Sequence, residues 1–156
     1  MLKLSYLDYQ ALRAHGEETY PHECCGALLG NSTPDGNHVR QTVRAGNTRS
    51  DRAHDRYNIA PQELMQIQKY ARGLGLDIVG FYHSHPDCPA QWSKTDFDEA
   101  HWVGCSYIIT RVNHGKADVT NSFLLTGTGE DDKQFLDEPV EIEMVPSETG
   151  TEQQKG

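Results

Sequence analysis

Two histidines and an aspartate in the middle of the chain are residue types that bind metal ions. His83 and His85 flank Ser84 directly after the apolar stretch 77–82, and Asp96 follows a short polar segment. Residues two apart on a strand point to the same face, so both imidazoles can aim at one point. Imidazole nitrogens and carboxylate oxygens are good zinc donors at neutral pH. The spacing therefore predicts a zinc site formed by His83, His85 and Asp96.

A serine adds a further polar group to this site. Ser93 stands three residues before Asp96, and this spacing at the start of a helix places both side chains on one face. Three protein ligands would leave the fourth tetrahedral position for water, which is typical of catalytic rather than structural zinc. We therefore expect one catalytic Zn²⁺ per chain. The other histidines need no functional role: His15, His22, His38, His54, His101 and His114.

The order of these residues resembles the motif of the JAMM metalloproteases, the metal-binding members of the MPN superfamily. The string E…H-S-H-P-x6-S-x-x-D is formed here by Glu23, His83, Ser84, His85, Pro86, Ser93 and Asp96. Segment 23–30 is similar to the strand that carries the family's catalytic glutamate. Segment 58–86 is similar to the helix and strand that lead into the histidines. The resemblance spans roughly residues 2–125.

The resemblance implies a role for each residue of the string. The two histidines and the aspartate would bind zinc. Glu23 would take a proton from water and pass it to the leaving amine, and Ser93 would stabilise the oxyanion of the tetrahedral intermediate. Ser84 would support the site from outside the ligand set. These roles agree with general chemistry, because a carboxylate that is not a ligand can move protons and a hydroxyl can stabilise a developing negative charge.

The resemblance also indicates a class of substrate. JAMM enzymes characteristically cut peptide or isopeptide bonds after the C-terminal Gly-Gly of ubiquitin or ubiquitin-like proteins. This chain of 156 residues is too short between its motifs for the insertions with which eukaryotic members grip ubiquitin. It is more similar to stand-alone bacterial and archaeal members, some of which release an amino acid such as cysteine from a sulfur-carrier protein. The implied partner is therefore a ubiquitin-like or sulfur-carrier protein.

Two other classes of protein share parts of this pattern. Many MPN proteins have lost ligands and serve only as non-catalytic scaffold or assembly subunits, so a scaffold remains the alternative. All five functional positions of the motif are present here, which disfavours it. A zinc deaminase needs an H-x-E and a P-C-x-x-C, and neither is in the sequence.

Composition excludes some partners. The net charge of −9, from 23 acidic and 14 basic residues, argues against nucleic acid, because phosphate binding needs a basic surface. No run of about 18 apolar residues exists, so we expect no membrane span. The N-terminus lacks a signal peptide's apolar region, and we therefore expect a cytoplasmic protein.

The cysteines form no C-x-x-C pair and should be free thiols: Cys24, Cys25, Cys88 and Cys105.

The elements that must position the site follow from periodicity and turn residues. Strands are expected at 2–6, 24–29, 38–45, 77–82, 105–112, 118–125 and 140–145. Helices are expected at 8–18 with Asp8 as N-cap, from Pro61 until Gly73 and Gly75 end it, and from the N-cap Ser93 to about Trp102. Turns or loops are expected at 31–37, 46–56 and 87–92.

These elements predict an α+β domain, a mixed α/β sheet with packed helices. The resemblance implies, more specifically, an MPN/JAB-like, cytidine-deaminase-like architecture. We expect a single domain over residues 1–146 and a disordered tail over 147–156, which has almost no apolar residue. In the loop between the ligands, Trp92 is expected to pack on the following helix. Cys88 could be a spare soft ligand or an oxidation-sensitive thiol.

Overall fold

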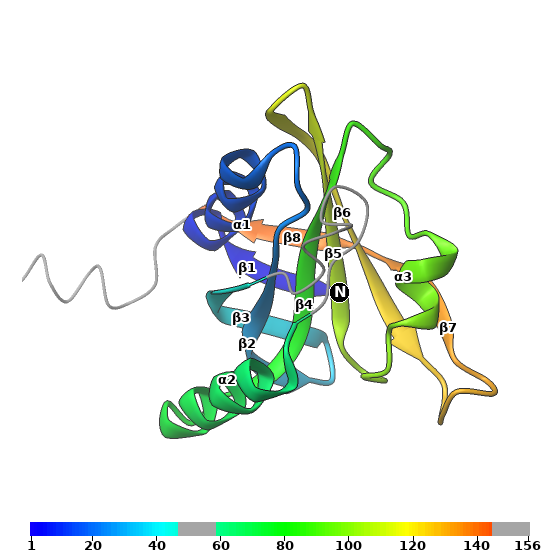
Figure 1. The fold of residues 1–156 in the computed structure, drawn as a ribbon. Coiled ribbons are helices and arrows are strands. Elements are labelled where there is room, and N and C mark those ends of the chain that lie inside the picture. The colour runs from blue at the N-terminus through cyan, green and yellow to red at the C-terminus, as the bar shows by residue number, and fades with distance from the viewer. Residues whose placement is uncertain (47–58, 145–156) are drawn as a thin grey trace, which may run out of the picture.

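The computed structural model describes residues 1–46 and 59–144, which form one mixed sheet with helices on both of its faces (Figure 1). The strands are β1 (Leu2–Ser5), β2 (Cys25–Thr33), β3 (Gly36–Ala45), β4 (Asp77–Pro86), β5 (Ser106–Asn113), β6 (Lys116–Thr126), β7 (Gln134–Glu138) and β8 (Val140–Glu143). The helices are α1 (Tyr6–Thr19), α2 (Pro61–Gly73) and α3 (Lys94–Asp98). The predicted fold class, a mixed sheet with packed helices, is confirmed.

Two apolar cores lie on opposite faces of the sheet. On one face, Leu12 of α1 belongs to a core with Tyr82 of β4. On the other face, Ile67 of α2 belongs to a core with Phe81, the next residue of the same strand. Strand β4 is therefore buried on both faces over residues 78–85, which explains why its sequence is apolar without alternation.

The strand order places β4 near the centre of the sheet. The order is β7-β6-β5-β4-β2-β3-β1-β8, and β4 pairs antiparallel with β2 and parallel with β5. His83 lies opposite Cys25 on one side and Ile109 on the other. Because β4 is hydrogen-bonded along both edges, the backbone that carries the two histidines is held firmly.

The two ends of the sheet are joined through one residue. Strand β7 pairs with β6 and β8 pairs with β1, yet only Pro139 separates them. The backbone N–H of Leu2 donates to the Pro139 carbonyl oxygen at 2.9 Å. The sheet must therefore curl so that its two ends approach each other.

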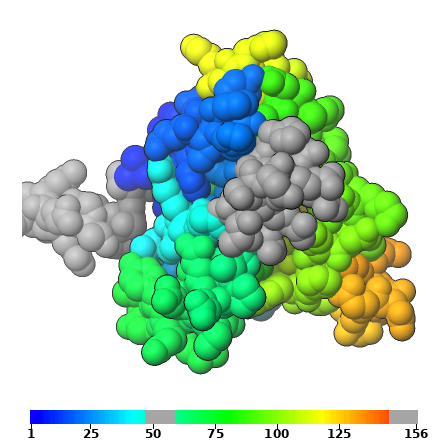
Figure 2. Space-filling model, in the orientation of Figure 1, coloured from blue at the N-terminus to red at the C-terminus, as the bar shows by residue number. Residues whose placement is uncertain are grey.

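The hairpin of β5 and β6 extends past the sheet to reach α1. In the space-filling view its tip, in yellow, lies against the blue helix (Figure 2). Arg13 of α1 donates to the carbonyl oxygens of Ala117 and Asp118, each at 3.0 Å. The helix is thereby fixed to the sheet by polar contacts as well as by its apolar face.

Several element boundaries differ from expectation. The first helix begins at Tyr6, because Ser5 rather than Asp8 is the N-cap: Ser5 Oγ accepts from the Asp8 N–H at 3.0 Å. Strands β2 and β3 continue into the expected turn at 31–37, since their pairing runs on to the ends of both strands. The third helix ends at Asp98 instead of near Trp102.

Strand β7 was not expected at all. Its five residues include only two apolar side chains, Phe135 and Leu136, which are adjacent and give no alternating pattern. The segment is a strand because it pairs with β6, and this pairing depends on the tertiary structure. Expected strand 140–145 forms as β8 and ends at Glu143 within the described part of the chain.

Some expectations fall outside the described residues. These are the loop expected at 46–56, apart from Gly46, and the tail expected at 147–156. The single domain over 1–146 stays a prediction. Within residues 1–46 and 59–144, no helix has the length and apolar content needed to cross a membrane.

A glycine in β4 tests the close packing of the two central strands. A Cβ at Gly80 would lie 2.2 Å from the carbonyl oxygen of Ser106 in β5. Gly80→Ala should therefore push β4 and β5 apart and lower the free energy of unfolding by about 1–3 kcal/mol. Chemical denaturation measures this change in the free energy of unfolding. Gly73→Ala is the matched control, because a Cβ there meets nothing within 4 Å. Equal stability of both variants would contradict this packing.

Candidate metal centre

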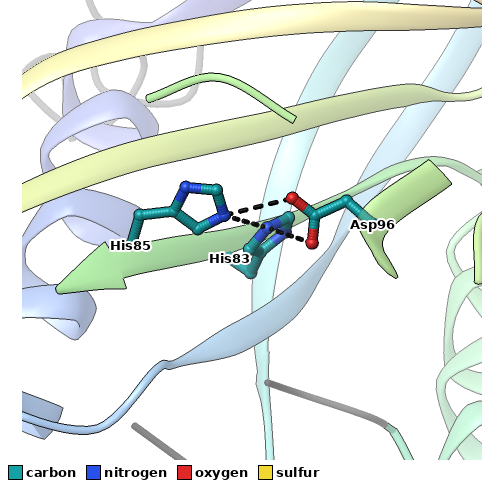
Figure 3. Close-up of side chains that lie close together, drawn as sticks. All are labelled: His83, His85 and Asp96. Carbon is teal, nitrogen blue, oxygen red and sulfur yellow. Dashed lines mark hydrogen bonds and ion pairs between the residues drawn. The ribbon is translucent and has the colours of Figure 1, made fainter. Parts of the chain in front are cut away.

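Three side chains from β4 and α3 bring their donor atoms to one point (Figure 3). The Nε2 atoms of His83 and His85 lie 3.1 Å apart. Asp96 Oδ1 lies 3.2 Å from His83 Nε2, and its Oδ2 lies 3.1 Å from His85 Nε2. The structure thus brings together the three residues that the sequence indicates as ligands. Among the described residues, they form a group whose donor atoms all lie within 4.8 Å of one another.

The spacing of these donors fits a small divalent metal ion. Zinc ligands bind at roughly 2.0–2.2 Å, so tetrahedrally placed ligand atoms lie about 3.3–3.6 Å from one another. The three separations observed here are close to that range. Two imidazoles and a carboxylate are also a donor set that zinc accepts. The group could therefore hold a metal ion.

The alternation of β4 directs both histidines to the face covered by α2 and α3. His83 is 2% exposed and His85 is 8% exposed. His85 Nδ1 lies 2.8 Å from the Pro89 carbonyl oxygen, which can only accept, so Nδ1 carries the proton. A proton on Nδ1 leaves Nε2 as the nitrogen with a lone pair for a metal. The sequence gave no signal for Pro89, because any residue type offers a carbonyl.

The start of α3 holds Asp96 in place. Ser93 Oγ accepts from the Asp96 backbone N–H at 3.1 Å, and Asp96 Oδ2 accepts from the Ser93 backbone N–H at 2.9 Å. This reciprocal pair is a capping box. The same carboxylate therefore caps the helix and faces the histidines. Ser93 is exposed, and its hydroxyl can still donate a hydrogen bond while it accepts this one.

The charges of the site act differently on its three donors. Burial would raise the pKa of Asp96, but its charge and hydrogen-bond interactions with His83 and His85 outweigh that effect and hold the pKa well below its ordinary value. Burial lowers the pKa of His83. Burial also acts to lower the pKa of His85, but the hydrogen bond and charge of Asp96 reverse this and raise it. An ionised carboxylate and a neutral imidazole are the forms that bind metal. The shifts at Asp96 and His83 therefore favour metal binding, whereas a metal competes with a proton for His85.

The register of β2 and β4 brings Glu23 to the same face. Cys25 lies opposite His83, and extending this antiparallel register by two residues puts Glu23 opposite His85. Side chains that lie opposite each other share a face of the sheet. Glu23 is 6% exposed, and its charge contributes to the raised pKa of His85. It is not one of the three converging donors, so it lies outside that group.

Ser84 joins the two strands at this point. Its Oγ accepts from the Cys24 backbone N–H at 2.9 Å, and its own N–H donates to the Cys24 carbonyl oxygen at 3.3 Å. The side chain points to the opposite face from the histidines, where a Cβ on Gly16 of α1 would lie 3.2 Å from its Cβ. Ser84 therefore fixes the backbone next to Glu23.

Trp92 and Cys88 lie in the loop between the histidines and Asp96, and neither belongs to the group of converging donors. Trp92 packs on the following helix as expected, with its ring centroid 5.6 Å from that of Phe97 and 5.5 Å from that of Phe135. Cys88 is a free and exposed thiol, and it does not belong to the group of converging donors. The other three cysteines are free and buried, in agreement with the sequence.

Comparison with known proteins gives matches in sequence and in structure. The family profile described as prokaryotic homologs of the JAB domain matches residues 8–126. A desampylase from Haloferax volcanii is 37% identical over 92 residues, which are 57% of this chain and 62% of that protein. The match thus spans less than two thirds of that relative.

Two solution structures resemble the whole described fold. One, of a protein from Desulfitobacterium hafniense, has a TM-score of 0.80 and 26% identity and covers 95% of this chain and 97% of the other. The second, of a protein from Salinibacter ruber, has a TM-score of 0.69 and 36% identity and covers 93% of both chains. Both similarities extend well beyond the site.

Metal binding can be tested without a substrate. A metal present at roughly 100 times its Kd adds about 2.7 kcal/mol to the free energy of unfolding. Zinc chloride should therefore raise the melting temperature of the wild-type protein, measured by calorimetry. His83→Ala and Asp96→Asn should abolish most of this increase. His22→Ala changes an exposed histidine outside the group and should retain it; loss of the increase in that variant would refute the assignment.

Proposed function

The chain belongs to the prokaryotic homologs of the JAB domain, and from this membership we propose that it is a zinc-dependent peptidase or isopeptidase. The proposed bond is the one after the C-terminal Gly-Gly of a ubiquitin-like or sulfur-carrier protein. The observation that carries the proposal is the convergence of His83, His85 and Asp96, with Glu23 beside them. The similarity to a desampylase supports a hydrolase of this kind.

The proposed ligands are His83, His85 and Asp96. Zinc held there would supply a Lewis acid that activates water near neutral pH and polarises the scissile carbonyl. The chain's contribution is to hold the three donors close together, with shifted pKa values that keep Asp96 ionised and His83 neutral. The Pro89 carbonyl orients His85, and the capping box orients Asp96. Such outer contacts fix the direction of metal ligands.

Glu23 is the proposed general base. A carboxylate outside the ligand set can take a proton from the attacking water and pass it to the nitrogen of the leaving amine. Its burial and its effect on the pKa of His85 support this role. Ser84 holds the adjacent backbone through both hydrogen bonds to Cys24. The proton therefore has a fixed acceptor.

Ser93 is the proposed donor to the oxyanion. Its Oγ accepts the Asp96 N–H, which orients the hydroxyl at the exposed start of α3. The O–H can then donate to a carbonyl oxygen as negative charge develops on it. Capping and catalysis are compatible, because one uses the lone pair of the oxygen and the other uses its hydrogen.

A substrate experiment tests the proposed reaction. The zinc-loaded protein is incubated with sulfur-carrier proteins whose C-terminal Gly-Gly is joined to cysteine, and with isopeptide-linked ubiquitin-like conjugates. Mass spectrometry should show release of the group after Gly-Gly. A carrier whose last glycine is replaced by valine is the control and should stay intact. A protein that binds zinc but cleaves none of the Gly-Gly-terminated adducts would favour the scaffold alternative.

The role of Glu23 has its own test. Glu23→Gln should retain one zinc per chain and lose at least about 100-fold in kcat, because the amide cannot accept the proton. Zinc content by elemental analysis and turnover by mass spectrometry measure both properties. Glu18→Gln is the matched control, since Glu18 is exposed and pairs with Arg44 at 2.7 Å. Retained activity in Glu23→Gln would remove Glu23 from this role.

A further inference from the structure

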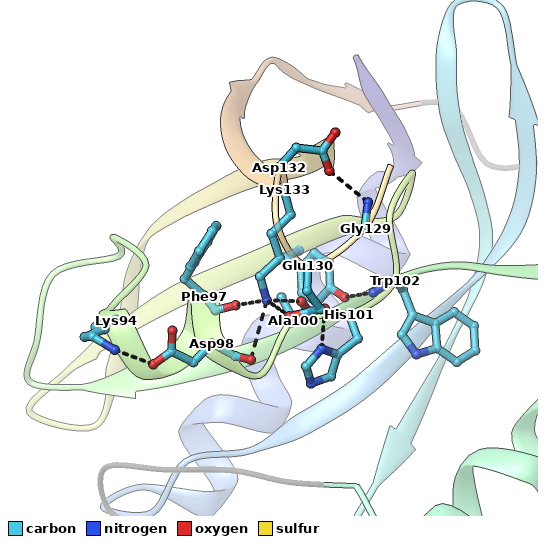
Figure 4. Close-up of polar contacts among 11 residues, drawn as sticks. Lys94, Phe97, Asp98, Ala100, His101, Trp102, Gly129, Glu130, Asp132 and Lys133 are labelled. Atoms are coloured by element: carbon cyan, nitrogen blue, oxygen red, sulfur yellow. Dashed lines mark hydrogen bonds and ion pairs between the residues drawn. The ribbon is translucent and has the colours of Figure 1, made fainter. Parts of the chain in front are cut away.

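A buried lysine contacts the short helix that carries Asp96 (Figure 4). Lys133 directly precedes β7, and its side chain is 4% exposed. Its Nζ donates to the carbonyl oxygens of Phe97 and Ala100, each at 2.8 Å, and lies 2.9 Å from Glu130 Oε1. The Asp98 carbonyl oxygen lies farther away, at 3.5 Å. An ammonium group has three N–H donors, so the three nearer partners can use all of them.

Helix α3 needs such a contact because it is very short. Lys94–Asp98 form little more than one turn, and isolated helices of this length are not stable in water. The capping box serves its first N–H groups, but the last carbonyls of any helix lack partners within the helix. Lys133 supplies donors and a positive charge at that end, where the carbonyls carry partial negative charge. Its Nζ also lies 4.8 Å from the centroid of the Phe97 ring.

The sheet determines where Lys133 lies. Phe135, two residues later, is paired with Leu125 in the β6–β7 ladder. The ring of Phe135 packs on α3, with its centroid 5.7 Å from that of Phe97. In the loop before Lys133, Asp132 Oδ1 accepts the N–H groups of Thr128 and Gly129, each at 2.9 Å. The lysine is therefore carried by a segment whose own geometry is well defined.

This segment lies outside the parts of the chain that carry the family motif. The family profile ends at residue 126, and Lys133 follows it. The metal donors lie on two elements of different stability: His83 and His85 on a strand paired along both edges, and Asp96 on one helical turn. The position of the carboxylate is therefore the part of the site that requires additional support.

We propose that Lys133 is a positioning residue for the metal centre. By fixing the C-terminal end of α3, it sets the carboxylate of Asp96 against the two imidazoles of β4. Rotation of this single turn would separate oxygens and nitrogens that now lie 3.1 and 3.2 Å apart. The inference rests on the proposed metal centre and adds a residue that maintains its geometry from the far end of the helix.

The first measurement is zinc affinity. Lys133→Met removes the charge and all three donors but keeps an apolar stem of similar length. Zinc affinity, measured by competition with a chromophoric chelator, should fall by about 10–100-fold, as is usual when an outer contact of a metal ligand is lost. Lys94→Met is the matched control on the same helix. The side chain of Lys94 is 88% exposed and pairs only at the surface with Asp98. The zinc affinity of Lys94→Met should therefore stay within about twofold of wild type.

The second measurement separates positioning from general stabilisation. If Lys133 acts through the carboxylate, Lys133→Met should cause little further loss of zinc affinity in an Asp96→Asn background. A purely structural lysine would weaken binding equally in both backgrounds. The visible absorption spectrum of the Co²⁺-loaded Lys133→Met protein should also move toward that of Asp96→Asn. Lys133→Gln keeps a neutral donor and should show an intermediate loss, so it serves if Lys133→Met does not fold by circular dichroism.

The outcomes separate this inference from the proposed function. Wild-type affinity in Lys133→Met, or equal losses in both backgrounds, would overturn the role of Lys133 and leave the metal centre intact. A wild-type protein that binds no zinc would overturn the proposed function, and the inference with it. Selective loss in the background that retains Asp96 would establish the positioning role.

Discussion

The contact between the Asp96 carboxylate and the two imidazoles of β4 is the interaction on which the rest of the structure depends. It joins the centre of the sheet to one helical turn, across separations of 3.1 and 3.2 Å. Burying such polar groups is unfavourable unless they have partners. His85 and Asp96 are held by further contacts as well, to the Pro89 carbonyl oxygen and to the cap at Ser93.

Strand β4 meets this constraint by using its two faces differently. The histidines point toward α2 and α3, while Ser84 points toward α1 and binds the backbone of Cys24. One strand therefore carries the two converging histidines on one face and, on the other, the serine that binds the backbone next to Glu23. Pairing along both edges of β4 makes this division stable. The carboxylate lacks such support within its own element, and for this reason the contacts of α3 with β7 and with Lys133 matter.

Local patterns were enough to predict most elements but not their ends. Helix α2 begins with Pro61 and β4 begins at the expected residue, because proline and a long apolar run act locally. The predicted N-cap of α1 was three residues too late, since Ser5 and Asp8 are both good capping residues. Strand β7 was not predicted, because its extended conformation depends on pairing with β6. Ends and edge strands depend on neighbours that the local sequence does not specify.

By itself, the sequence predicted that His83, His85 and Asp96 converge, because strand alternation and helix-start spacing bring them within reach of one point. It also placed Ser93 at the cap, since that contact spans only three residues. Only the tertiary structure decided that Glu23 lies on the same face as the histidines, through the register of two strands far apart in the chain. It likewise decided that Lys133 reaches α3. Contacts between distant segments depend on how the sheet pairs and curls, and no local pattern encodes them.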